Sequence, residues 1–354
     1  MMRPLSLLDL TLVSSGSSST ETLRDAVAVA RLAERHGYER IWYAEHHSGA
    51  GLSSASPEIL IAHITAHTDS IRLGSGGVML PNHAPLWIAE AFRLLEALHP
   101  GRIDLGLGRA PGTNQMTALA MRRSREALVG DDYPELLAEL IAYGDGFPMG
   151  HPFAAITAAP ADVRTPPIWL LGSSDFSGRL AANEGLGFAF AAHINPTGAV
   201  PALREYRAAF RPSACVDAPR AILTVSVVVG ETEEEAMSEA RRTELFMLGV
   251  MTGRMGRYPT LEEALAHRWT PDERALMQSF PLRSFVGDAG SVWRQVDALA
   301  EETEADEVMV TTSLPDRDLR ETMLRGLAHE AGLSPRPGAE VGENAPCERI
   351  AVGG

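Results

Sequence analysis

Three consecutive ionisable residues, Glu45, His46 and His47, follow directly after a short apolar segment at residues 41–44. Four apolar residues in a row predict a buried strand, and α/β folds place their chemistry at the carboxyl ends of strands. Adjacent side chains of an extended chain point to opposite sides, so the two histidines are expected to face different surroundings. We therefore predict that one histidine is functional and the other structural.

Two glycine-rich segments follow other predicted strands. Residues 74–81 read Gly-Ser-Gly-Gly-Val-Met-Leu-Pro, and glycines inside a strand pattern are typical of either a bulge or a place where a flat ligand lies against the backbone. Residues 105–112 superficially resemble a dinucleotide-binding fingerprint, but the third glycine comes one residue late. This second segment supplies a guanidinium, Arg109, on an open turn, which suits either a phosphate or simple solvent exposure.

A serine-rich turn, Ser173, Ser174 and Ser177, follows a later predicted strand and opens a helix. An ordinary helix cap explains one serine but not three, whereas amides and hydroxyls at a helix N-terminus form an anion site. In a barrel of parallel strands, Arg109 and this turn project from the same end. Together they are predicted to hold one phosphate.

Metal ligation is the competing interpretation of the histidines. His63 and His67 stand four residues apart on a predicted helix, but residue 64 is Ile where a zinc protease would have its glutamate. We interpret this pair as ordinary surface or interface histidines. A metal site built from Glu45, His46 and His47 stays open as the weaker alternative, and the prediction is that no metal is bound.

The composition excludes several classes of function. All 31 basic residues are Arg, so neither a lysine Schiff base nor a P-loop lysine is possible. A net charge of -15 argues against nucleic-acid and anionic-membrane partners. The only cysteines are Cys215 and Cys347, too few for a disulfide framework. Because the sequence has neither a membrane-spanning apolar run nor a signal peptide, we expect a cytoplasmic protein.

Strand and helix patterns alternate at intervals of roughly 30 residues, which indicates repeated βαβ units. Strands are predicted at residues 5–10, 40–44, 71–79, 102–107, 168–171, 187–191, 221–229 and 307–311. Helices are predicted at residues 20–36, 56–67, 85–98, 131–143, 176–184, 198–210, 290–303 and 316–331, with Gly37 ending the first. Eight of each favour a (β/α)8 TIM barrel over an open sheet.

Two insertions exceed what a barrel needs, one after strand 4 at residues 112–165 and one after strand 7 at residues 231–286. Long insertions at these places are typical of lids, and the second is expected to contain a Met- and Arg-rich loop around Gly249, Gly253 and Gly256. Residues 1–332 are predicted to form one domain, and residues 333–354 a disordered tail.

The order of these pieces resembles that of the bacterial luciferase-like flavin monooxygenases over nearly the whole chain. The matching features are Glu45-His46-His47, the segment from Gly76-Gly77 to Pro81, Gly108-Arg109 and Ser174-x-x-Ser177, joined by the late segment at residues 285–312. No single motif is specific, whereas their order and spacing together are.

The resemblance implies a barrel that takes reduced FMN from a separate reductase and reacts it with O2 through a C4a-peroxyflavin. His46 matches the family's catalytic histidine, with Glu45 as the residue that would orient it. Gly76 and Gly77 match a non-proline cis peptide beneath the flavin ring, and Arg109, Ser173, Ser174 and Ser177 lie at the matching phosphate site. Gly108 replaces a reactive cysteine of the family. The helices at residues 57–67 and 85–98 match the face of a homodimer.

The substrate is expected to be an apolar organic molecule, first a bulky apolar or aromatic secondary-metabolite intermediate and next a long-chain aldehyde. A deazaflavin-dependent dehydrogenase of the same fold and a non-catalytic flavin-binding barrel are the two alternatives. Retention of both His46 and Arg109 argues against the second.

Overall fold

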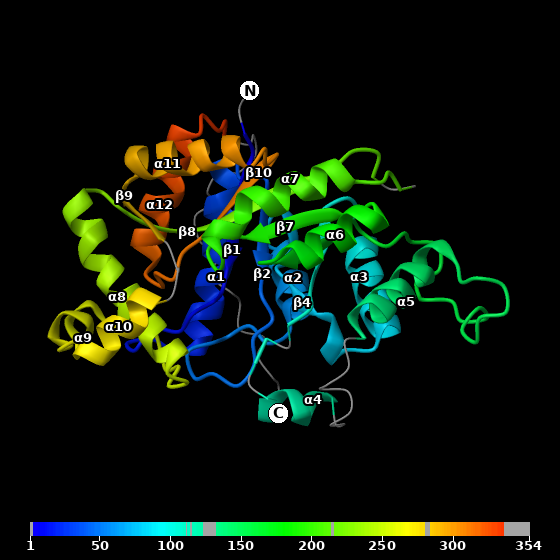
Figure 1. Cartoon of the computed structure of the whole chain (residues 1–354), viewed down its shortest axis with the longest axis horizontal. Coiled ribbons are helices and arrows are strands. Elements are labelled where there is room, and N and C mark those ends of the chain that lie inside the picture. The colour runs from blue at the N-terminus through cyan, green and yellow to red at the C-terminus, as the bar shows by residue number, and fades with distance from the viewer. Residues whose placement is uncertain are drawn as a thin grey trace, which may run out of the picture.

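The computed structural model describes residues 3–110, 112–113, 115–122, 132–213, 216–279 and 284–335. Within these residues, eight parallel strands close into a barrel, because β10 pairs with both β1 and β8 (Figure 1). The ring consists of β1 (Leu5–Asp9), β2 (Arg40–Tyr43), β3 (Arg72–Ser75), β5 (Ile103–Gly108), β6 (Ile168–Gly172), β7 (Gly187–Ala191), β8 (Ala221–Gly230) and β10 (Glu307–Thr311). The (β/α)8 barrel predicted from the sequence is confirmed.

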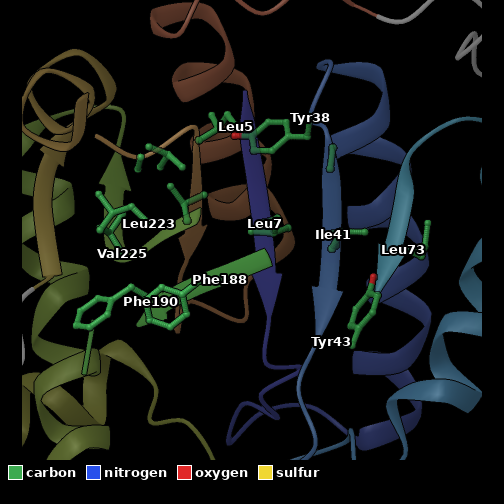
Figure 2. Packing of buried hydrophobic residues seen from close by; sticks show 14 of the residues in the cluster. Leu5, Leu7, Tyr38, Ile41, Tyr43, Leu73, Phe188, Phe190, Leu223 and Val225 are labelled. Atoms are coloured by element: carbon green, nitrogen blue, oxygen red, sulfur yellow. The ribbon is translucent and has the colours of Figure 1, made fainter. Parts of the chain in front are cut away.

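Strand side chains alternate between two buried environments. Leu7 and Ile41 face outward and pack against the helices, together with Phe188 and Val225 (Figure 2). The intervening residues, such as Leu8 and Trp42, face inward and form a separate cluster inside the barrel. Because both faces are buried, the strands appear in the sequence as almost continuous apolar runs.

Eight helices among the described residues surround the barrel, and short local signals position their ends. Ser18 and Glu21 form a capping box at the start of α1, and Gly37, at a φ of +83°, follows its last turn as predicted. The ring consists of α1 (Ser19–Arg35), α2 (Pro57–Thr65), α3 (Pro85–Leu98), α5 (Tyr133–Asp145), α6 (Asp175–Glu184), α7 (Ala199–Ala209), α11 (Ala289–Glu302) and α12 (Arg317–Glu330).

The strand predicted at residues 71–79, with glycines inside its pattern, is interrupted at those glycines. Its glycines divide it into β3 and the two-residue β4 (Val78–Met79), and both pieces pair with β5. The peptide bond between Gly76 and Gly77, at the break, is cis, as the family resemblance implied.

The insertion at residues 231–286 is more regular than the predicted loop. It contains α8 (Glu233–Met251), which runs through Gly249, followed by α9 (Leu261–Ala266), α10 (Pro271–Ser279) and a further strand, β9 (Ser284–Asp288). The strand β9 extends the sheet from β8 outside the ring. Sequence analysis missed β9 because the strand has only five residues and lies outside the βαβ alternation.

The first insertion, at residues 112–165, begins with α4 (Gln115–Arg122), and its α5 packs on α3. The segment after α5 projects from the body of the molecule (Figure 1), where Met149 is fully exposed. Residues 336–354 of the predicted tail lie outside the described residues, so the tail and the domain boundary at residue 332 stay predictions. In the described part of the chain, no helix is both long and apolar enough to cross a membrane.

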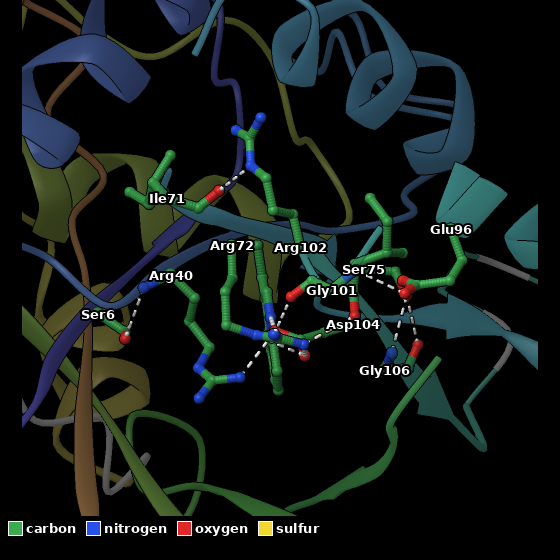
Figure 3. Close-up of polar contacts among 12 residues, drawn as sticks. Ser6, Arg40, Ile71, Arg72, Ser75, Glu96, Gly101, Arg102, Asp104 and Gly106 are labelled. Carbon is green, nitrogen blue, oxygen red and sulfur yellow. Dashed lines mark hydrogen bonds and ion pairs between the residues drawn. The ribbon is translucent and has the colours of Figure 1, made fainter. Parts of the chain in front are cut away.

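A buried charge network fills the barrel at the amino ends of its strands (Figure 3). Arg40 binds Asp104 at 2.7 Å and Glu307 at 2.8 Å, and Arg72 binds the other oxygen of Asp104 at 2.5 Å. Burial raises the pKa of Asp104, but Arg40 and Arg72 outweigh it and hold that pKa below its ordinary value. Two cations therefore balance two carboxylates at the end of the barrel opposite the strand ends that carry the candidate site.

Candidate active site

One cavity of about 520 Å³ opens at the carboxyl ends of the strands. Its size lies in the range of roughly 300–1,000 Å³ that small-molecule and cofactor sites occupy. Seven of the eight residues singled out from the sequence line it, and Glu45 does not. The seven are His46, Gly76, Gly77, Arg109, Ser173, Ser174 and Ser177. The closed barrel thus brings together side chains that follow four different strands.

The glycines at the cavity wall are closely packed, Gly77 against backbone and Gly76 against side chains. A Cβ on Gly77 would lie 2.8 Å from the carbonyl oxygen of Gly106, and one on Gly76 would lie 2.6 Å from Leu8 Cδ1. The glycines mark an interruption of the strand and also line the cavity, and the flat ligand expected against them stays a prediction. Gly108, which replaces the family's cysteine, would bring a Cβ to 2.8 Å from Met79 Sδ.

Arg109 and the serine turn lie together at one side of the cavity. The guanidinium of Arg109 lies over the ring of Phe176 at 4.2 Å, and this contact holds it beside the start of α6. Ser174 is the N-cap residue of α6, yet its side chain makes no capping hydrogen bond. Asp175 in the first turn is paired with Arg179 at 2.5 Å, which offsets its charge. A helix start without a side-chain cap next to an arginine fits an anion.

His46 lines the cavity with one ring edge buried in the protein. Its Nδ1 is buried and has no hydrogen-bond partner among the described residues. Burial lowers the pKa of His46, while the nearby charge of Glu45 acts in the opposite direction. The imidazole is therefore mainly neutral at pH 7 and is able to accept a proton.

Glu45 does not orient His46, so this sequence prediction is corrected. Its carboxylate accepts hydrogen bonds from His47 Nε2 at 2.7 Å, His83 Nε2 at 2.9 Å and the backbone N–H of Met79 at 2.8 Å. Burial raises the pKa of Glu45, but these hydrogen bonds outweigh it and keep that pKa below its ordinary value. Through these hydrogen bonds Glu45 links His47, in the loop after β2, to Met79 of β4 and to His83 in the segment after it.

A second histidine in the cavity, His193, was missed in the sequence. It follows β7 by two residues, so the strand-end rule that identified His46 also applied to it. Its Nδ1 lies 3.4 Å from the carbonyl oxygen of Thr224, and its backbone N–H donates to the same oxygen. Burial is the main cause that lowers the pKa of His193 to about 4.

The histidines considered as a metal pair lie outside this cavity. His63 lies on α2 and His67 just after it, with their ring centroids 4.6 Å apart and their planes tilted by 55°. The Nδ1 of His67 is engaged by the carbonyl of His63 at 2.8 Å, which leaves that nitrogen unavailable for a metal. The described residues contain no group of three His, Cys, Asp or Glu side chains placed to hold a metal ion.

A barrel with a largely apolar cavity at its carboxyl rim, lined by Arg109, the start of α6 and two histidines, fits the class of TIM-barrel proteins that bind small molecules at that rim. The sequence profile of the luciferase-like monooxygenases matches residues 4–307. The chain belongs to that family.

Individual relatives agree with this placement. A luciferase-like monooxygenase of Escherichia coli strain K12 is 40% identical over 315 residues, which is 89% of this chain and 93% of that one. The N-acetyl-S-alkylcysteine monooxygenase of Bacillus subtilis strain 168 is 38% identical over 265 residues, 74% of this chain and 78% of that protein. The crystal structure of apo-MsnO8 superposes with a TM-score of 0.87 at 38% identity and covers 94% of this chain and 100% of its own.

A more distant structure supports the fold alone. The oxygenating constituent of 3,6-diketocamphane monooxygenase from Pseudomonas putida, solved in complex with FMN, is 19% identical with a TM-score of 0.66. It covers 94% of this chain and 98% of that one.

Proposed function

We propose that this protein is an FMN-dependent monooxygenase that takes reduced FMN from a separate reductase and transfers one oxygen atom of O2 to an apolar organic substrate. The observation that carries the proposal is the arrangement of the cavity. The start of α6, which lacks a side-chain cap, and Arg109 line the same cavity as Gly76, Gly77 and the neutral ring of His46. The bound reduced flavin would supply the two electrons that are needed to place one oxygen atom of O2 in the substrate and to release the other as water.

The residues present fit the two ends of FMN. Arg109, the first-turn amides of α6 and the hydroxyls of Ser174 and Ser177 would bind the phosphate through charge-assisted hydrogen bonds. Gly76 and Gly77 leave the backbone open to a flat ring, because neither carries a side chain toward the cavity.

His46 would accept or donate a proton at the reacting end of the cavity. Its neutral form at pH 7 makes it a base, and its buried ring edge holds the imidazole in one position. Apolar residues of α8, including Phe246 and Val250, line the cavity and would keep water away from the reaction. This assigns to α8 the covering role that was expected of the second insertion.

The proton-transfer role is tested with the substitution His46→Ala. Product formation is measured with chemically reduced FMN, O2 and either decanal or N-acetyl-S-benzylcysteine. We expect the rate to fall by about 100- to 10,000-fold, while the affinity for FMN stays within a factor of two. His63→Ala, on the exposed face of α2, is the matched control. A wild-type rate in the His46 variant would show that the assigned role is wrong.

The substrate class is inferred from the lining, in which the large side chains are mostly the apolar Leu, Met, Phe and Trp. Our first candidate is an aromatic or other secondary-metabolite intermediate, and the second is a long-chain aldehyde. The relative that acts on N-acetyl-S-alkylcysteine adds a thioether as a third candidate. Product analysis with one compound of each class, under the same reduced-flavin conditions, separates them.

Two other activities compete with this proposal, a deazaflavin-dependent dehydrogenase and a barrel that binds flavin without turnover. Titration of the purified protein with FMN, reduced FMN and deazaflavin, followed by O2 uptake, distinguishes all three. The monooxygenase is expected to bind reduced FMN and to consume O2 in a substrate-dependent manner. Preference for deazaflavin without O2 uptake, or flavin binding without product, would favour the respective alternative.

Besides the reductase, the partner that we propose is a second copy of the chain. Large apolar side chains are exposed on α2 and α3, and such patches are typical of association surfaces. They are Ile59, Trp87, Leu94 and Leu98. Light scattering of wild type and of Leu94→Glu tests whether this homodimer forms. We further propose that the protein is cytoplasmic.

A further inference from the structure

The cavity contains a second hydrogen-bonding group that the proposed reaction does not use, the ring of His193. In the eight-strand ring, β2 and β7 lie four strands apart, so His46 and His193 enter the cavity from opposite sides. Their charged forms would repel each other, which adds to the effect of burial on His193. Both rings are therefore mainly neutral at pH 7.

The contact with Thr224 determines which ring nitrogen of His193 carries the proton. A backbone carbonyl only accepts hydrogen bonds, so Nδ1, at 3.4 Å from this oxygen, must be the protonated nitrogen. Nε2 then carries a lone pair. It is the ring nitrogen left to face the cavity, because His193 lines the cavity and Nδ1 is engaged by the strand.

The remaining lining residues make this lone pair distinctive. The lining that the structure describes includes neither Asp nor Glu, and its one permanent cation is Arg109 on the side of the proposed phosphate site. Away from Arg109 and from the ring of His46, to which the proposed reaction assigns proton transfer, the polar side chains are hydroxyls such as Thr224 and Ser226, which both donate and accept. Nε2 of His193 only accepts, so it discriminates between ligands that bring a hydrogen-bond donor and ligands that do not.

We propose that His193 is a specificity-determining residue that accepts a hydrogen bond from an O–H or N–H group of an uncharged, mainly apolar substrate. This inference rests on the proposed function, because it assigns the part of the cavity beyond the flavin to the substrate. A substrate that lacks such a donor would leave the ring nitrogen buried and unpaired, which weakens its binding.

The test uses two probes that differ only in the donor, 2-naphthol and its methyl ether. Their dissociation constants are measured by calorimetry on the FMN-saturated wild type, on His193→Phe and on His193→Gln. We compare the dissociation constant of the methyl ether, divided by that of 2-naphthol, between proteins. In wild type this ratio should be about ten times the ratio in His193→Phe, which corresponds to one neutral hydrogen bond. His193→Gln, which keeps an acceptor oxygen, should retain part of the ratio. His151→Phe, on the exposed segment after α5, should behave as wild type.

An equal ratio in wild type and His193→Phe would overturn the proposal, and so would a wild type that binds neither probe. A loss of FMN affinity in His193→Phe without a change in the ratio would also overturn it, since the donor would then belong to the flavin. Binding of FMN itself, measured first in the same samples, reports on the proposed function separately.

A second measurement avoids substitution. In the wild type labelled with 15N-histidine, the Nε2 resonance of one imidazole should shift when 2-naphthol is added and should stay in place with the methyl ether. Absence of a naphthol-specific shift would contradict the proposal even if His193→Phe failed to fold.

Discussion

At the scale of single residues, the cavity lining contains two kinds of polar group. Arg109 and the start of α6 provide positive potential, whereas His46 and His193 provide neutral imidazoles in an apolar surrounding. A cation and a protonatable ring perform different functions. The substitutions that test them should therefore affect different measurements.

Arg109→Gln should weaken FMN binding by about 10- to 100-fold, because a hydrogen bond to a charged phosphate is worth more than one between neutral groups. Riboflavin, which has no phosphate, should bind the variant and wild type equally in a fluorescence titration. Arg179→Gln, on α6 but paired with Asp175 and not part of the cavity lining, serves as the control. An equal loss for FMN and riboflavin would place Arg109 at the ring instead of the phosphate.

Glu45 should make stability depend on pH in the acid range. Its hydrogen bonds keep its folded-state pKa below the ordinary value of 4.5, in spite of burial. The carboxylate therefore contributes stability that is fully present above that value and is lost as pH falls through the lower folded-state pKa. Urea unfolding at pH 7 should show Glu45→Gln to be less stable by about 2 kcal/mol, and this difference should shrink toward pH 4. A difference that stays constant with pH would contradict the assignment, and exposed Glu262→Gln is the control.

At the scale of elements, the break between β3 and β4 determines where the cavity wall lies. A methyl group on residue 77 would approach the backbone of β5 to 2.8 Å, where no flexible side chain is able to yield. We expect Gly77→Ala to lower the free energy of unfolding by about 1–3 kcal/mol and to weaken FMN binding as the wall shifts. Gly16→Ala, where a Cβ has nothing within 4 Å, should change neither. Stability is measured by thermal unfolding and FMN affinity by flavin titration of both variants. A Gly77→Ala protein with wild-type stability would refute the packing argument.

At the scale of the whole molecule, the network at the opposite end of the barrel links strands that are distant in the sequence. Arg40 of β2 joins Asp104 of β5 and Glu307 of β10. Its removal would leave two buried carboxylates with Arg72 alone. The variant Arg40→Met should therefore lose about 3–5 kcal/mol of stability in urea unfolding, while exposed Arg179→Met should unfold almost as wild type. An unchanged urea midpoint for Arg40→Met would show that the network does not hold the barrel closed.

The sequence by itself determined the alternation of strands and helices, the helix starts and the strand ends that carry His46, Arg109 and the serine turn. These features depend on short-range periodicity, capping residues and turn chemistry, all of which act within a few neighbouring residues. The fold class followed because few architectures accommodate eight such units.

Only the tertiary structure decided which partner each polar side chain has. Glu45 binds His83, which lies 38 positions further along the chain, instead of its neighbour His46, and Arg40 binds Glu307 across 267 positions. The pairing of β9 with β8 and the entry of His193 into the cavity were likewise settled by barrel closure. Closure sets distances between residues far apart in sequence, and hydrogen bonds and ion pairs depend on those distances, which local patterns do not contain.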